Sequence, residues 1–388
     1  MAHVPLVLKI SSICYLLENQ PHEYRLFTIF IAAASPLFRK NEYINGVNDI
    51  LQLISKHRSA IMGFAILWVM LFHLRVPTDF AAIDFIRSIG YGGVDIFLFL
   101  SGFGLYYSLS RKNFDIKKYY KSRFFRILPE FWVVLSVVFL AQMDFNLRSF
   151  SFLLCRATTL GYWIGYRDES WFISCIVFLY ALYPIYFRLF KKYGIKTSFI
   201  FIGAGFSLML IYALTCIFCY NNQNFGGFII LTYARIPIFF IGAIFGHWAK
   251  DGCSIELTNK LKKIGLSSAI IAFIILICFT NFLHSKLQTC SLAYIPYIVI
   301  TPVLCILLAM FFEKYKTIDK IFTIVGLMSL ELYLCHIFIY KLFYEFIDFL
   351  DKDSSNILTM LTSFFAAYIL YIVNKKLLTR RTNIRIRP

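Results

Sequence analysis

Five ionisable side chains lie inside long apolar stretches, where a charge is unfavourable and therefore usually serves a function or a specific contact. They are His73, Asp95, Arg235, Glu331 and His336. An imidazole oriented by a carboxylate or by a second polar group is the usual general base, so these residue types predict proton removal from a nucleophile. Hydrogen bonding between helices is the alternative interpretation, and for Glu331 and His336 it has equal weight.

A second polar group lies in the basic stretch 111–126. Arg123 and Arg126 are three positions apart, so on a helix their side chains point the same way. Guanidinium forks bind phosphate bidentately, which predicts a site for a phosphorylated ligand. Anchoring of the chain by positive charge explains the stretch equally well.

The elements that must position these residues are membrane helices. The 388 residues are 59% hydrophobic, and the mean hydropathy is +0.69, which is more apolar surface than one soluble core of this length buries. The net charge of +18 is divided into short clusters between apolar runs, a pattern of topology signals rather than of nucleic-acid binding. We therefore predict an all-α integral membrane protein and no nucleic-acid partner.

Ten apolar runs are long enough to cross a hydrocarbon core of about 30 Å at about 20 residues each. They are too long and continuous for the strands of a barrel, so all are expected to be helical. The expected bundle of about ten transmembrane helices covers residues 59–75, 89–110, 126–143, 169–190, 197–220, 226–249, 264–284, 290–313, 321–347 and 355–375.

Lys and Arg residues lie in alternate connections between these spans, from Lys56 and Arg58 to the C-terminal tail. An opposite loop is acidic and contains Asp348, Asp351 and Asp353. By the positive-inside rule, the basic segments and both termini are expected in the cytoplasm, with the protein in the inner (plasma) membrane.

The helix rise sets the depth of the candidate residues. His73 lies about 22 Å beyond Arg58 on its span, and His336 lies about 24 Å beyond Lys320. Asp95 enters from the opposite side and reaches about 12 Å. The other two candidates fall in the middle or the outer half, so the sequence predicts one shared polar chamber.

Residues 1–55 fit the span pattern less well, because 26–37 is apolar but too short to cross a membrane. We interpret 1–55 as a peripheral extension or an overextended start, with a cleaved signal or an extra span as alternatives. Residues 56–378 are expected to form one membrane domain, and 379–388 a basic cytoplasmic tail. The ten cysteines are scattered, and the one CxxC, Cys216 with Cys219, lacks a second ligand pair, so no metal site is predicted.

Seven motifs, in order, resemble those of acyltransferase family 3, the ten-helix bacterial membrane acyltransferases that modify surface glycans, peptidoglycan or secreted small molecules. The resemblance covers residues 57 to about 375. The motifs are GFAILWVMLFH at 63–73, GVDIFLFLSGF at 93–103, RFFRILP at 123–129, SWFI at 170–173, YALYP at 180–184, RIPIFFIG at 235–242 and SLELYLCH at 329–336.

The resemblance implies that His73 is the catalytic histidine and that Arg123 and Arg126 bind acyl-CoA. Many members carry an arginine eleven positions before this histidine, where the present chain has Met62. Arg58, one turn earlier, would take that place. Many members also carry a glutamate after the Trp of the fourth span, and its absence here suggests a subgroup with a different acceptor.

These observations predict a membrane acyltransferase of the O-acetyltransferase type. It would move an acyl group, with acetyl expected, from acyl-CoA to a hydroxyl of a cell-surface or exported glycan or lipid-linked saccharide. Acyl-CoA is then a substrate, no cofactor is bound permanently, and membrane lipid is the surrounding partner. His73, oriented by Asp95 or His336, would act as base or carry the acyl group itself, with Arg235 or Arg58 stabilising charge.

A transporter or flippase for a polar or lipid-linked solute is the main alternative function. Transporters often contain repeated, interrupted spans in both halves of the chain, and no such pairing is visible in this sequence. A structural membrane partner in glycan assembly is the third possibility, and it predicts that substituting Arg123 and Arg126 leaves CoA binding unchanged.

Overall fold

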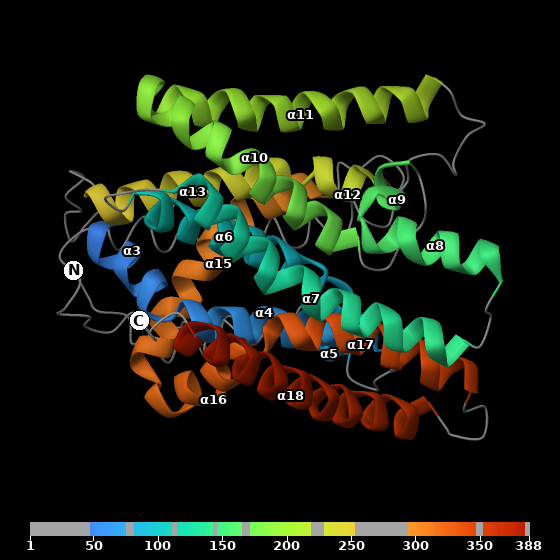
Figure 1. The fold of residues 1–388 in the computed structure, drawn as a ribbon. Helices are drawn as coiled ribbons and strands as arrows, with labels where there is room; N and C mark the ends of the chain where they lie inside the picture. Colours follow the sequence, from blue (N-terminus) through green and yellow to red (C-terminus); the bar gives the residue numbers. More distant parts are fainter. Residues whose placement is uncertain are drawn as a thin grey trace.

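The computed structural model describes residues 47–74, 81–110, 115–142, 146–164, 171–218, 229–252, 294–346 and 352–384. Every regular element assigned in these ranges is helical, and most of the long helices run parallel or antiparallel to one another (Figure 1). The helices are α3 (Val47–Lys56), α4 (Arg58–His73), α5 (Ala81–Ser88), α6 (Gly92–Leu109), α7 (Ile116–Gln142), α8 (Leu147–Ala157), α9 (Leu160–Trp163), α10 (Trp171–Tyr193), α11 (Ile195–Phe218), α12 (Ile229–Tyr233), α13 (Ile236–Asp251), α15 (Ile295–Lys314), α16 (Lys316–Leu327), α17 (Ser329–Phe346) and α18 (Lys352–Ile384).

The predicted class of all-α membrane protein is confirmed. Within the described ranges, seven helical segments are long and apolar enough to cross a membrane, and the α16–α17 pair also passes this test when taken together. The expected span 264–284 lies outside the described residues, and each of the other expected spans coincides with a helix or a helix pair. The first expected span is the shorter apolar helix α4.

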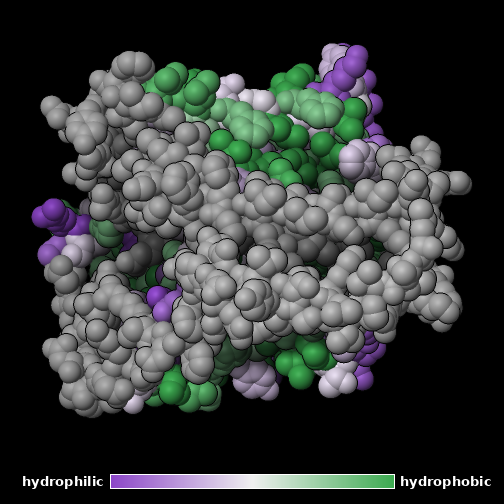
Figure 2. Space-filling view, turned by 180° about the vertical axis from the view of Figure 1, so that it is seen from behind, coloured by the Kyte–Doolittle hydropathy of each residue, from purple (hydrophilic) through white to green (hydrophobic). Residues whose placement is uncertain are grey.

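The outside of the bundle is apolar, as a lipid solvent requires. Exposed large apolar side chains include Val137 on α7, Ile200 and Leu210 on α11, and Leu361 and Phe365 on α18. In Figure 2, green apolar side chains lie along the middle of the upper edge of the molecule, where α11 lies, and purple hydrophilic side chains lie at its right-hand end. These helices therefore present the surface that faces hydrocarbon.

Helix α6 is the central element, with 83% of its span buried inside the protein. It packs on α13 at backbone distance, because an added Cβ at Gly102, Gly242 or Gly246 would meet a backbone carbonyl of the facing helix. Small residues four apart, such as Gly242 and Gly246, let membrane helices approach this closely. The contact fixes Asp95, in the first turn of α6, against the start of α13.

A second close contact joins α4 to α16. A Cβ at Gly63 would collide with the Phe322 carbonyl, and one at Gly326 with the Ser59 carbonyl. His73 lies ten residues beyond Gly63 (73 − 63), and His336 lies ten residues beyond Gly326 (336 − 326). The glycine contact thus sets the relative position of the two segments that carry the histidines.

The expected continuous span 321–347 is wrong in one respect. The chain bends by 66° between α16 and α17, so two helices replace one. Met328 lies at the break, where its N–H bonds back to the Val325 carbonyl at 3.1 Å. The depth calculated for His336 along one straight helix therefore does not hold, although the residue still reaches the level of His73.

Basic residues gather at one end of the bundle, on the left in Figure 1, which we call the basic end. They include Lys191 and Lys192 at the end of α10, Lys250 at the end of α13, and Lys314 at the end of α15. The opposite end, called the far end, carries α8 and α9 (Figure 1). The alternation of basic segments in the sequence predicts this clustering.

Helix α3 also lies at the basic end and packs against α13 and α15. Its Leu51 and Ile54 side chains are buried. The packed bundle thus includes the chain from Val47 onward, within the segment 1–55 that the sequence sets apart, while residues 1–46 lie outside the described ranges.

A charged group at the basic end, called the His57 cluster, joins α3 and α4 to α15 and α16. The Nδ1 of His57 lies 2.7 Å from Asp319 Oδ1, and its Nε2 lies 2.7 Å from Glu313 Oε2. Lys56 and Lys316 each form a 2.7 Å ion pair with Glu313. The hydrogen bond with Glu313 raises the pKa of Lys56, so this lysine stays charged across the physiological pH range.

Candidate active site

Two histidines from different helices meet toward the far end of the bundle. His73 is the last residue of α4, and His336 lies in α17. Their ring centroids are 5.1 Å apart, with 66° between the ring planes. His73 is partly exposed, whereas His336 is buried, so His73 is the member of the pair that a substrate can reach.

Backbone hydrogen bonds select the tautomer of both rings. The Nδ1 of His73 lies 2.8 Å from the Val69 carbonyl oxygen, and the Nδ1 of His336 lies 2.9 Å from the Leu332 carbonyl oxygen. A carbonyl oxygen only accepts, so Nδ1 must donate, and in a neutral imidazole Nε2 is then the acceptor. Each histidine therefore presents a basic Nε2 for proton removal.

The position of His73 in its helix favours the same chemistry. α4 ends at His73, and Leu74 is extended. The last carbonyls of a helix carry partial negative charge, which stabilises a cationic imidazole in the final turn.

Asp95 and Arg235 form a buried ion pair. Arg235 Nη2 lies 3.5 Å from Asp95 Oδ2, and both side chains are almost completely buried. The Arg235 guanidinium lies over the rings of Trp171 and Tyr294, at 4.9 and 4.7 Å from their centroids. Its Nη1 donates to the Leu231 carbonyl oxygen at 3.1 Å.

The structure gives Asp95 and His336, the two residues predicted to orient His73, different contacts. Asp95 pairs with Arg235, and His336 is the ring partner of His73. Arg235 is held at the junction of α12 and α13, directly before Ile236 and Pro237. The carboxylate of Asp95 thus matches the charge of the buried Arg235 guanidinium.

Three arginines gather nearer the basic end. Arg58 lies within electrostatic range of Arg123 and Arg126, and its guanidinium packs against Gly104. Arg123 Nη2 donates to Ser108 Oγ at 2.9 Å, and the guanidinium lies 5.9 Å from the Tyr180 ring centroid. Within the described residues, none of the three forms an ion pair with a carboxylate. Such a group of cations attracts an anionic ligand.

Glu331 faces a carboxyl group that the sequence analysis missed. Glu130 on α7 and Glu331 on α17 are both buried, and their charges act on each other and on Arg126. Two carboxylates buried together repel, so a proton held by one of them lowers the electrostatic penalty. The available signal was an acidic residue inside an apolar span, four positions after Arg126.

The predicted single chamber is therefore divided into separate groups around α17, which packs against both α4 and α7. His336 faces His73 on α4, whereas Glu331 faces Glu130 on α7. Asp95 and Arg235 form the third group. In the part of the chain that the structure describes, no three His, Cys, Asp or Glu side chains are grouped to hold a metal ion.

The fold and this arrangement define a multi-pass membrane protein with a histidine pair inside the bundle and three arginines nearer one end. The chain belongs to the acyltransferase family 3: the family model described as an acyltransferase domain matches residues 60–373. This range contains all the candidate residues named above except Arg58. No curated protein and no solved structure matches the chain.

Proposed function

We propose that the protein transfers an acyl group from acyl-CoA to a hydroxyl group of an exported glycan, with His73 as the general base. The observation that carries the proposal is the His73–His336 pair, in which backbone carbonyls accept from both Nδ1 atoms, so that Nε2 is the acceptor nitrogen of each neutral ring. The family match supports acyl transfer as the class of reaction.

The proposed reaction is direct transfer. His73 Nε2 removes the proton of the acceptor hydroxyl as its oxygen attacks the thioester carbonyl. The new C–O bond forms, the C–S bond breaks, and the imidazolium returns the proton to the CoA thiolate, which leaves as the thiol. The buried ring of His336 supports the His73 ring in the orientation that this exchange requires.

The donor is proposed to enter from the basic end. Arg58, Arg123 and Arg126 supply positive charge for the phosphates of CoA. From Arg58 to His73 the helix rises about 22 Å, similar to the extended pantetheine arm of about 20 Å. A CoA held by these arginines can therefore extend its thioester toward His73. The positive-inside rule assigns the basic end to the cytoplasm, where acyl-CoA is made.

The test is mass spectrometry of surface glycans from cells that produce the wild-type protein, no protein or His73→Ala. Loss of the same ester-linked acyl group in the null strain and in the variant is expected, and it identifies the group. His247→Ala is the matched control, because His247 lies near the basic end and pairs with Asp251. Glycans that are identical in all strains would refute the proposal.

A further inference from the structure

Aromatic side chains connect His73 to the start of α15. The Phe72 ring meets the His73 ring edge-on, with 5.2 Å between the ring centroids. The same Phe72 ring lies 5.7 Å from the Tyr91 ring, and the Tyr91 ring lies 5.7 Å from the Tyr294 ring, again between centroids. Tyr91 directly precedes α6 and Tyr294 directly precedes α15, so this first arc joins the end of α4 to the starts of two other helices.

A second arc of aromatic contacts runs from His336 to the start of α10. The centroid of the His336 ring lies 5.8 Å from that of Tyr333, and the Tyr333 ring lies 4.9 Å from the Phe172 ring. The Phe172 and Trp171 rings are 6.3 Å apart and nearly perpendicular, at 83°. Trp171 is the first residue of α10, so this arc joins α17 to that helix start.

Arg235 joins the two arcs into one closed ring of contacts, which we call the aromatic collar. Its guanidinium lies over the rings of Trp171 and Tyr294, the last members of the two arcs. A desolvated guanidinium attracts aromatic faces, so Arg235 holds these two rings in place relative to each other. The collar thus connects the histidine pair with the Asp95–Arg235 ion pair.

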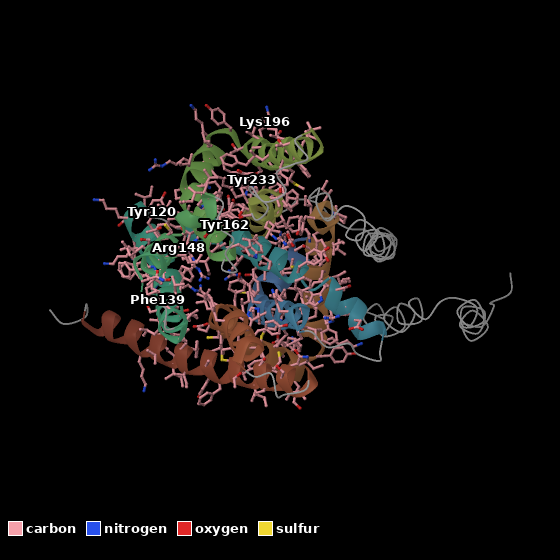
Figure 3. The ribbon with its side chains drawn as sticks, turned by 90° about the vertical axis from the view of Figure 1, so that its right-hand side faces the viewer. Tyr120, Phe139, Arg148, Tyr162, Lys196 and Tyr233 are labelled. Atoms are coloured by element: carbon pink, nitrogen blue, oxygen red, sulfur yellow. The ribbon has the colours of Figure 1, made fainter. Side chains whose placement is uncertain are left out.

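The chain segment that carries Arg235 is supported from the side by α9. The Tyr162 hydroxyl of α9 lies 2.8 Å from Thr232 Oγ1 in α12, three positions before Arg235. Figure 3 looks along the bundle from the far end and shows Tyr162 close to Tyr233, the neighbour of Thr232 in the chain. This hydrogen bond fixes the junction of α12 and α13, and with it the position of the guanidinium.

Part of the collar is accessible. The partly exposed members, which we call the rim, are Phe72, His73, Trp171 and Tyr294. All four lie at helix ends, in the last turn of α4 or at the starts of α10 and α15. Aromatic surface that a ligand can reach therefore belongs to the same ring of contacts as the proposed base.

A sugar ring matches the chemistry of this rim. A pyranose has C–H groups on the faces of its ring and hydroxyl groups around its edge. Its C–H face loses contact with water when it packs on an aromatic side chain, and an edge hydroxyl can then approach an imidazole. Ligand sites commonly combine aromatic walls with a few polar groups in this way. Because the donor is proposed to enter from the basic end, the rim leaves the opposite side of His73 for the acceptor.

We propose that Trp171 and Tyr294, held by Arg235, form a platform on which a pyranose ring of the acceptor packs beside the histidine pair. The inference rests on the proposed function for the reaction that follows binding. It adds that the acceptor is recognised by the face of a sugar ring, which excludes open-chain polyols and lipid alcohols. Trp171 and Tyr294 then determine which acceptor is used, and they do not contact the donor.

The binding test measures saturation transfer by NMR from the purified full-length protein in detergent to methyl β-pyranosides of glucose, galactose and N-acetylglucosamine. Sorbitol is the matched probe, because it has the hydroxyl groups of a sugar but no ring. We expect at least one pyranoside to bind at least about tenfold more tightly than sorbitol, through its ring C–H protons. Trp171→Ala should raise the Kd for that pyranoside at least about tenfold.

Three further variants make the binding test specific. Trp163→Ala is the matched control, because Trp163 is also partly exposed near the far end but contacts Tyr162 and Phe178 instead of the collar. It should bind the pyranoside as the wild type does. Trp171→Phe keeps an aromatic ring and should stay within about threefold of the wild-type Kd. Tyr294→Leu, which keeps apolar volume without a ring, provides the same comparison if Trp171→Ala fails to fold.

Three results would overturn the inference. The first is an equal Kd for the pyranoside in the wild type, Trp171→Ala and Tyr294→Leu. The second is equal binding of sorbitol and the pyranosides, because hydroxyl groups alone would then account for recognition. The third is a wild-type protein that binds none of the pyranosides.

The kinetic test separates this inference from the proposed function. With acetyl-CoA as donor, Trp171→Ala should raise the KM for the pyranoside at least about tenfold and leave kcat and the KM for acetyl-CoA within about twofold. An unchanged KM for the pyranoside would refute the platform while leaving acyl transfer established. A wild-type protein that binds the pyranoside through Trp171 but transfers to no acceptor would refute the proposed function and leave the sugar site standing.

Discussion

Helix α4 has a histidine at each end, and the two differ in their surroundings. His57 directly precedes the helix, and both of its ring nitrogens lie 2.7 Å from carboxylate oxygens. His73 is the last helical residue, with Nδ1 on a backbone carbonyl and a second imidazole beside it. Carboxylates lie at both ring nitrogens of His57, whereas the Nδ1 bond of His73 to a carbonyl makes Nε2 the acceptor nitrogen of its neutral ring. The comparison teaches that the partners of a histidine, more than its burial, decide whether it can act as a base.

The largest expected effect is on the far-end histidine. His73→Ala should lower kcat for acyl transfer by about 10²–10⁴-fold, the usual contribution of a general base. The measurement is the rate of acetyl transfer by purified protein, with the Tm as a control for folding. An unchanged kcat in His73→Ala would contradict the proposal that, of the two histidines at the ends of α4, His73 acts as the base.

The next largest effect concerns the three arginines nearer the basic end, which form no ion pair with any described carboxylate, in contrast to the His57 cluster. The Arg123→Gln, Arg126→Gln double variant should raise the KM for acyl-CoA about 100-fold, because it removes two charge-assisted phosphate contacts. The Lys192→Gln, Lys196→Gln double variant, which changes two exposed lysines at the same end, is the matched control for net charge. An equal rise in the KM for acyl-CoA in both variants would indicate that overall positive charge, rather than a specific arginine site, attracts the donor.

His57→Ala should separate stability from catalysis. The change leaves Glu313 and Asp319 without their shared partner and should lower the free energy of unfolding by about 2 kcal/mol, as for loss of hydrogen bonds to charged groups. The readout is the Tm in detergent, with kcat measured well below that temperature. His247→Ala, which affects a more exposed pair, should shift the Tm less. A large fall in kcat at unchanged Tm would contradict the structural role of His57.

The smallest effect concerns the supporting ring. His336→Asn keeps a polar group of similar reach but removes the imidazole that adjoins His73, so kcat should fall about tenfold with the KM for donor unchanged. In the companion variant His336→Ala, kcat should fall further, because the shorter side chain also leaves a cavity in a buried site. If both variants have wild-type kcat, His336 is a packing residue only.

Much of the fold could be predicted from the sequence because membrane helices have a strong signal. Apolar runs of sufficient length mark the spans, and the alternating basic segments indicate that Lys191 and Lys250 belong at one end of the bundle. The break at Met328 could not be predicted, since neither a proline nor an adjacent glycine pair marks it. It depends on packing of α16 against α4, which is a tertiary contact.

The residue types of the candidate site could be predicted from the sequence, whereas the contacts between those residues could be predicted only in part. The depth argument and the resemblance both indicate His73 with His336, and the structure places their rings in contact. Asp95 could not be assigned to Arg235 from the sequence, because 140 positions separate them (235 − 95) and the pairing depends on the α6–α13 contact. Glu130 escaped notice because it follows Pro129 in a stretch dominated by its basic neighbours.

The contact of Gly63 with α16 limits where the chain can tolerate insertions and deletions. A single residue inserted between Gly63 and His73 would turn the histidine by about 100° around α4 and remove it from His336. The same holds for a residue inserted into α17 between Ser329 and His336, beyond the break at Met328. Insertions and deletions are therefore expected to be excluded from these two intervals and tolerated in the connections between helices, where a library of single-codon insertions would find them.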